Sequence, residues 1–146
     1  MFLNVEQTRR IWIARLLVLV VLMINLQAAL LFIMMPDRFV GAFELSGIPG
    51  RAAVQGVGIL FLMWQVPYVF AVVNPYKNRR SLVEANLMQL IGLVGETVLL
   101  FSIPAGYPIL SSSIRRFIFF DAGGLILLLL ALWLIGKNTK SIISSV

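Results

Sequence analysis

The sequence contains no cysteine and no histidine, and these two absences exclude several kinds of site. Without cysteine there is no disulfide, no thiolate nucleophile and no cysteine ligand for an iron–sulfur cluster. Without histidine the chain lacks the residue that most often binds haem or transition metals, and a Ser-His-Asp or Cys-His catalytic centre is impossible. We therefore expect no metal site and no bound cofactor, and we assign no catalytic residue.

Charged residues are also scarce, at 12% of the chain, whereas 60% of the residues are hydrophobic. This composition lies outside that of soluble globular domains and favours a protein surrounded by a lipid bilayer. The net charge of +6 comes mainly from basic residues beside the apolar runs, where they indicate topology and contact with anionic lipid. No basic soluble domain is present, so a nucleic acid partner is not expected.

Four long apolar runs dominate the sequence, at about residues 11–35, 52–73, 82–103 and 114–135. Each is close to the roughly 20 residues that cross a hydrocarbon core of about 30 Å as an α-helix. Strands of a membrane β-barrel would alternate in polarity, and the run 125–134 does not. The sequence predicts an all-α fold, a single integral membrane four-helix bundle over residues 1–146. Short connections predict that chain neighbours pack antiparallel.

The basic residues predict the orientation of this bundle. One side of the membrane receives eight of them, and the other receives four. The larger group is Arg9, Arg10, Arg15, Lys77, Arg79, Arg80, Lys137 and Lys140, and the smaller is Arg38, Arg51, Arg115 and Arg116. Because cytoplasmic loops carry the excess of Lys and Arg, both termini are predicted to be cytoplasmic.

Three polar side chains are predicted to lie at one depth inside the apolar runs. Glu96 is fourteen residues into the third helix, so roughly 21 Å from its start at 1.5 Å per residue. Asp121 lies seven residues into the fourth helix, which puts it roughly 10 Å below the opposite edge, at about the same level. Asn25, on the first helix, is predicted to lie at the same depth. Ionisable residues inside a membrane span are rare and mark functional sites by default.

Arg51, Arg115 and Arg116 enter the membrane just above this polar layer. A pair such as Arg116 with Glu96 would balance the charge. Without such a pair, one carboxyl group is expected to be neutral and to donate a hydrogen bond. The polar layer is thus either a structural pair that fixes helix register or a site that binds or moves something.

Several amides lie on helix faces that also carry small residues. Gln55 and Gln65 share one face of the second helix, and Gln89 lies on the face of Glu96 in the third. Lipid cannot satisfy an amide, so we expect Gln55, Gln65, Gln89 and Asn25 to form hydrogen bonds between helices. Gln55 is included in the polar layer.

The segment 36–50 joins the first two helices on the side opposite the termini and contains Asp37, Arg38, Phe39, Phe43 and Glu44. It is either a lid over the polar layer or an amphipathic connector whose aromatic rings rest among lipid headgroups.

The first helix is flanked by arginines and contains an asparagine (Arg9, Arg10, Asn25), Pro36 follows it shortly, and the second and third helices are rich in glycine. In these features the chain resembles the small bacterial four-helix membrane proteins grouped as DoxX-like, including the BphX-like set. The namesake of that family is similar to a membrane subunit of a quinone-linked oxidoreductase. The resemblance therefore implies a partner more than a reaction, and it carries no catalytic residue to this chain.

Together these features predict an accessory or structural subunit in the bacterial inner membrane. It would dock to partner membrane-protein subunits of a larger complex, such as an oxidoreductase, and its polar layer would hold the helices together or contact a quinone or lipid. The alternative is a free-standing binder, isomerase or proton-coupled transporter of a small lipophilic molecule, with Glu96 and Asp121 as acid and base or ion site.

Overall fold

The computed structural model describes residues 5–143, with side chains through Gly136, and this part of the chain contains helices and no strand. The long helices are α1 (Val5–Met34), α2 (Gly47–Val73), α3 (Arg79–Ser102) and α4 (Pro108–Ile143). Two short 3-10 helices, η1 (Pro36–Arg38) and η2 (Val40–Phe43), join α1 to α2. The all-α prediction is confirmed for these residues, and the four α-helices are long and apolar enough to cross a membrane.

The helices extend beyond the apolar runs that predicted them. α1 begins at Val5 and includes a polar first turn, in which Arg10 pairs with Glu6 one turn away. α4 begins at Pro108, where the fixed backbone angle of proline suits the first helical position. An apolar run therefore marks only the part of a helix that suits lipid.

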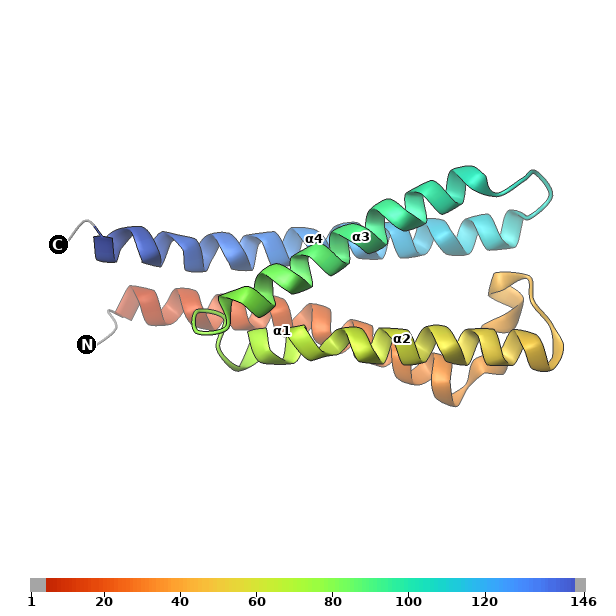
Figure 1. Cartoon of the computed structure of the whole chain (residues 1–146), viewed down its shortest axis with the longest axis horizontal. Helices are drawn as coiled ribbons and strands as arrows, with labels where there is room; N and C mark the ends of the chain where they lie inside the picture. The colour runs from red at the N-terminus through yellow and green to blue at the C-terminus, as the bar shows by residue number, and fades with distance from the viewer. Residues whose placement is uncertain (1–4, 144–146) are drawn as a thin grey trace.

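Each helix runs back along the one before it, so the start of α1 and the end of α4 lie at one end of the bundle (Figure 1). We call this the terminal end, and the opposite one the loop end. Arg15 Nε donates to the carbonyl of Val72 at 2.9 Å, and Gln55 Nε2 donates to that of Ile33 at 3.1 Å. Residue numbers thus rise along α1 as they fall along α2. α1 also packs along α4, and α3 packs along α4 more extensively than along α2.

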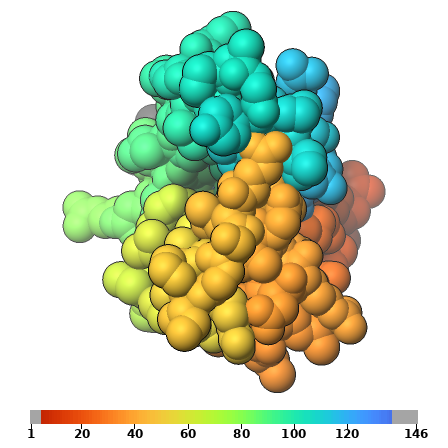
Figure 2. Space-filling model, turned by 90° about the vertical axis from the view of Figure 1, so that its right-hand side faces the viewer, coloured from red at the N-terminus to blue at the C-terminus, as the bar shows by residue number. Residues whose placement is uncertain are grey.

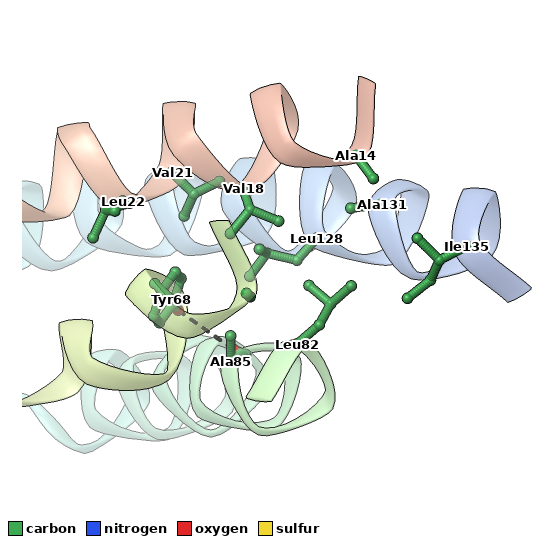
Figure 3. Close-up of a cluster of buried hydrophobic side chains, with 11 residues drawn as sticks. Ala14, Val18, Val21, Leu22, Tyr68, Leu82, Ala85, Leu128, Ala131 and Ile135 are labelled. Carbon is green, nitrogen blue, oxygen red and sulfur yellow. Dashed lines mark hydrogen bonds between the residues drawn. The ribbon is translucent and has the colours of Figure 1, made fainter. Parts of the chain in front are cut away.

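The buried core lies toward the terminal end and draws on all four helices (Figure 3). Small side chains allow the helices to approach closely there. Tyr68 enters this core from α2, and its hydroxyl oxygen lies 3.3 Å from the carbonyl oxygen of Ala85 on α3. The cluster consists of Ala14, Val18, Val21, Leu22, Tyr68, Ala71, Leu82, Ala85, Leu128, Ala131 and Ile135.

The loop end is more open, because α3 leans away from α2 as it leaves the core (Figure 1). The segment after α1 lies against the start of α4 (Figure 2), where a Glu44 carboxylate oxygen accepts a hydrogen bond from the backbone N–H of Ile109 at 3.2 Å. Five aromatic rings meet where this segment packs on the helices, with neighbouring ring centroids 4.7 to 6.4 Å apart. We call them the aromatic cluster: Phe32, Phe39, Phe43, Phe61 and Phe117. Phe39 and Phe43 therefore pack on other helices in this structure.

Gly58 of α2 packs tightly against α1. A Cβ atom at this position would lie 2.9 Å from the Ala29 carbonyl oxygen and from side-chain atoms of Phe32 and Ile33. We expect Gly58→Ala to lower the free energy of unfolding by about 1–3 kcal/mol, the usual range for overpacking. The measurement is reversible unfolding of the purified protein in mixed micelles. Gly56→Ala is the matched control, since its Cβ meets nothing within 4 Å, and we expect it to be neutral or stabilising. Equal losses in both variants would contradict this account.

Candidate functional site

A cavity of about 270 Å³ opens where α3 leaves α2, and Asn25, Glu96 and Asp121 all line it. The structure thus brings together the three residues that helix length placed at one depth. We call this the acidic cavity, because it contains two carboxyl groups and no basic side chain among its described lining residues. Apart from the amides Gln65 and Gln89, the rest of its lining is apolar or aromatic, with Phe61 and Trp64 from α2 and Phe117 and Phe120 from α4.

A chain of hydrogen bonds forms the floor of the acidic cavity and joins three helices. The Tyr68 hydroxyl on α2 donates to Gln89 Oε1 on α3 at 2.6 Å. Gln89 Nε2 then donates to Asp121 Oδ1 on α4 at 2.8 Å. Tyr68 and Gln89 are buried, so neither group has water as an alternative partner. The chain therefore fixes the Asp121 carboxyl group and ties α2 to α3 and α4.

Two glycines make this arrangement possible. A Cβ atom on Gly92 of α3 would collide with the Asp121 carboxylate of α4. A Cβ atom on Gly124 of α4 would lie 2.7 Å from Gln89 Nε2 of α3. The Asp121 side chain of α4 thus fills the space beside Gly92 of α3, and the Gln89 side chain of α3 fills the space beside Gly124 of α4. Two of the glycines on the polar faces therefore have a definite role, which is to bring α3 and α4 close enough for the hydrogen bond.

The Glu96 carboxyl group is not part of this chain. It lies two turns beyond Gln89 on α3, and its Oε2 is buried without a hydrogen-bond partner in the described structure. Glu96 and Asp121 line the same cavity from α3 and α4. Oε1 of Gln65, a residue that is 5% exposed and also lines the cavity, is likewise buried and unpaired. Two residues of the cavity lining therefore carry hydrogen-bond acceptors that the described residues do not satisfy.

The arginines predicted to approach the acids lie elsewhere in the structure. Arg51 Nε is 3.3 Å from Asp37 Oδ1, and Arg115 lines a surface depression beside the α3–α4 connection. Arg116 donates to the Ser113 hydroxyl at 2.9 Å and faces a different cavity. The two described ion pairs, Arg10 with Glu6 and Arg51 with Asp37, involve neither intramembrane acid. The described structure thus lacks the charge-balanced pair of Arg116 with Glu96.

The four amides predicted to join helices differ in their contacts. Gln89 bridges α2 and α4, and Gln55 donates to α1, so both join helices as expected. Gln55 lies outside the acidic cavity. Gln65 instead donates to the Phe61 carbonyl within its own helix, at 2.7 Å. Asn25 is buried in the cavity wall.

Tyr68 is the important site residue that the sequence did not reveal. Its neighbours Pro67 and Val69 are apolar, and a tyrosine in such a run is normally a packing residue. A signal was nevertheless present, because Tyr68 is three residues beyond Gln65 on the polar face of α2. The aromatic walls were missed because they come from two helices, α2 and α4, whose relative rotation the sequence does not state.

The hydrogen-bond chain should behave as one energetic unit. We expect the effects of Tyr68→Phe and Asp121→Asn on the free energy of unfolding to be non-additive by about 1 kcal/mol, because both bonds pass through Gln89. The measurement is a double-mutant cycle by unfolding in mixed micelles. The control cycle pairs Asp121→Asn with Tyr107→Phe, at an exposed tyrosine outside the cavity, and should be additive within about 0.5 kcal/mol. Additivity in both cycles would mean that the three groups do not act together.

Comparison with protein-family models, with curated proteins and with solved structures found no match to this chain. The resemblance to DoxX-like proteins therefore stays a prediction. Function is inferred from the acidic cavity and from the groups that line it.

Proposed function

We propose that this protein is an integral membrane binding protein for a small lipophilic molecule whose polar group donates hydrogen bonds. The observation that carries the proposal is the acidic cavity, which combines two carboxyl groups and unpaired buried acceptors with apolar and aromatic walls. Ligand sites have this character: mostly apolar, with a few polar groups that fix orientation. The volume of about 270 Å³ suits a small ligand, since pockets for drug-sized molecules span roughly 300–1,000 Å³.

The ligand would enter from the lipid. The most exposed side chains at the edge of the cavity are Ile91 and Leu99 on α3 and Trp64 on α2. They place the opening between these two helices, which diverge toward the loop end (Figure 1). In a bilayer such an opening faces acyl chains rather than water, so a molecule already dissolved in the membrane has direct access.

An amine is the polar group that fits best. Glu96 Oε2 and Gln65 Oε1 both accept hydrogen bonds, and an ammonium group supplies up to three donors. Its positive charge would also balance the acids, which have no basic side chain beside them in the described structure. The rings of Phe61, Trp64, Phe117 and Phe120 would add cation–π attraction to a cation held among them. The geometry supports binding, and we assign no catalytic or transport step to Glu96 or Asp121.

We further propose that the four helices cross a bacterial inner membrane as an antiparallel bundle with both termini in the cytoplasm. The return of each helix along its predecessor supports this arrangement (Figure 1), and so does the excess of basic residues at the terminal end. The acidic cavity would then lie nearer the outer surface of the membrane.

Docking to a larger complex is the second candidate function. It is favoured by α4, whose exposed side chains between residues 125 and 134 are all apolar: Ile126, Leu129, Leu130 and Trp133. Purification in a gentle detergent, with mass spectrometry of co-purifying proteins and lipids, separates the two candidates. A stoichiometric foreign subunit, released by polar substitutions at Ile126 and Leu130, would support docking. A lone 16.3 kDa chain that retains a lipophilic molecule would support the binding protein.

The binding proposal predicts selectivity for the polar group of the ligand. Decylamine, 1-decanol and decanoate have the same chain length and differ in charge and hydrogen-bonding capacity. We expect the protein in nanodiscs to bind radiolabelled decylamine most tightly, decanol more weakly and decanoate not at all. Glu96→Gln and Asp121→Asn should each weaken decylamine binding about tenfold or more, because a buried charged partner is removed.

Glu84→Gln is the matched control for these variants, since Glu84 is an exposed acid on the same helix outside the cavity, and it should bind decylamine as the unmodified protein does. Binding of all three probes with equal affinity in the unmodified protein and in Glu96→Gln would show partition into lipid alone, and would overturn the proposal.

The absence of cysteine allows a direct test of topology, because a single introduced cysteine is then the only thiol that a maleimide can label in this chain. Lys77→Cys and Ala105→Cys lie in exposed connections at opposite ends of the bundle. We expect a membrane-impermeant maleimide to label Ala105→Cys in intact spheroplasts, and to label Lys77→Cys only after the membrane is opened. The reverse pattern would invert the proposed orientation.

A further inference from the structure

A second cavity, of about 430 Å³, lies between α1, the segment after it and the start of α4. Two arginines line it, Arg38 from η1 and Arg116 from α4, and no acidic residue does. We call it the basic cavity. Phe32, Phe39, Phe43 and Phe117 of the aromatic cluster form part of its wall, and Phe117 also lines the acidic cavity. The aromatic cluster therefore lies between an acidic cavity and a basic one.

The two arginines of the basic cavity are not neutralised by the described part of the chain. Neither forms an ion pair there, and the hydrogen bond from Arg116 goes to a hydroxyl group, that of Ser113. Both side chains are exposed. Two guanidinium groups that line one cavity from separate elements, with no acid in the lining, suit an anion that binds between them, such as a phosphate group.

The basic cavity continues into an apolar one along the same pair of helices. A cavity of about 380 Å³ between α1 and α4 shares Ile24 with it and reaches Val21 and Leu127 without any polar side chain. Gly123 and Gly124 leave its α4 side open, and a Cβ atom on Gly123 would meet nothing within 4 Å. The two cavities together form a groove with basic groups at the loop end and only apolar side chains at its other end.

The length of this groove matches one leaflet of a bilayer. From Phe32 to Val21 the groove follows eleven residues of α1, or roughly 16 Å at 1.5 Å per residue. Half of a hydrocarbon core of about 30 Å is roughly 15 Å. An acyl chain whose headgroup lies at Arg38 and Arg116 would therefore reach the level of Val21 and Leu127 near the middle of the membrane.

We propose that this groove binds one anionic phospholipid, with its phosphate between Arg38 and Arg116 and one acyl chain between α1 and α4. The opposite charges of the groove and of the lipid favour this occupant over a zwitterionic phospholipid, and the apolar half favours it over free inorganic phosphate. The site is separate from the acidic cavity, and no part of this inference depends on a ligand bound there.

The test is native mass spectrometry of the full chain in detergent, titrated with phosphatidylglycerol and with phosphatidylcholine of the same chain length. We expect one phosphatidylglycerol molecule to bind per chain, in preference to phosphatidylcholine. Arg38→Gln and Arg116→Gln should each weaken this binding roughly fivefold, the effect of one basic residue near an anionic lipid. Arg115→Gln, which removes a neighbouring arginine outside the groove, is the matched control and should bind normally.

A second variant tests the apolar half of the groove. Gly123→Leu should fold normally, because its side chain enters open space, but it should block the acyl chain. We expect it to weaken binding of long-chain phosphatidylglycerol while leaving binding of the dihexanoyl form unchanged. Gly56→Leu, at an equally open position on α2, should affect neither.

Three results would overturn the proposal. The first is equal affinity for phosphatidylglycerol and phosphatidylcholine, and the second is an equal loss in Arg38→Gln and Arg115→Gln. The third is displacement of the lipid by millimolar inorganic phosphate, which would mean that the site holds a free anion.

Discussion

The hydrogen-bond chain from Tyr68 through Gln89 to Asp121 is the interaction on which the rest of this structure depends. A polar group in an apolar surrounding must find its partner within the protein, and here one amide satisfies a phenol and a carboxyl group on two other helices. The contact requires glycine at 92 and 124, since a Cβ at either position would occupy the space of the opposite side chain. These few residues hold α3 against α4, while α3 is free to lean away from α2 beyond Tyr68. The acidic cavity is the direct consequence of that divergence.

The aromatic cluster explains why acids and arginines remain apart. The sequence places Arg116 just above the polar layer, where it could pair with Glu96. A buried charged group is normally paired with a group of opposite charge. Phe117 follows Arg116 by about 100° around the helix, packs on Phe32, Phe43 and Phe61, and lines both the cavity that contains Glu96 and the one that contains Arg116. Arg116 is therefore directed to the side of α1, and Glu96 stays on the side of α2. The aromatic cluster thus lies between the acids and the arginines within one small bundle. The acidic cavity lacks a basic side chain and the basic cavity lacks an acid among their described lining residues, so a ligand of opposite charge can balance either one.

The sequence predicted the helices well because the signal for them is local. Length and apolarity located four helices, and counting residues from the helix ends put Asn25, Glu96 and Asp121 at the level where the structure has its acidic cavity. The helix ends were less accurate, since polar turns such as the one that holds Glu6 and Arg10 continue a helix beyond its apolar run. Pairing between helices was not predictable in the same way. Whether Arg116 meets Glu96, or Gln65 turns back to its own helix, depends on the rotation of each helix about its axis, which no single helix encodes.

The two ends of the bundle are built from different residues. The terminal end contains the closely packed core, and the loop end contains the two charged cavities. At the terminal end Ala14, Ala71, Ala85 and Ala131 are fully buried, so the backbones approach closely and little space remains. At the loop end the corresponding volume is occupied by phenylalanine rings, which are rigid and meet edge to face or stacked, and rings of fixed shape leave gaps that alanines would close. Both charged cavities lie toward this end, and Tyr68 is shared by the core and the acidic cavity. A substitution at Glu96, Arg38 or Arg116 removes no contact of the alanine-lined core and no bond of the hydrogen-bond chain, so binding can be tested in these variants while the contacts that join the helices stay in place.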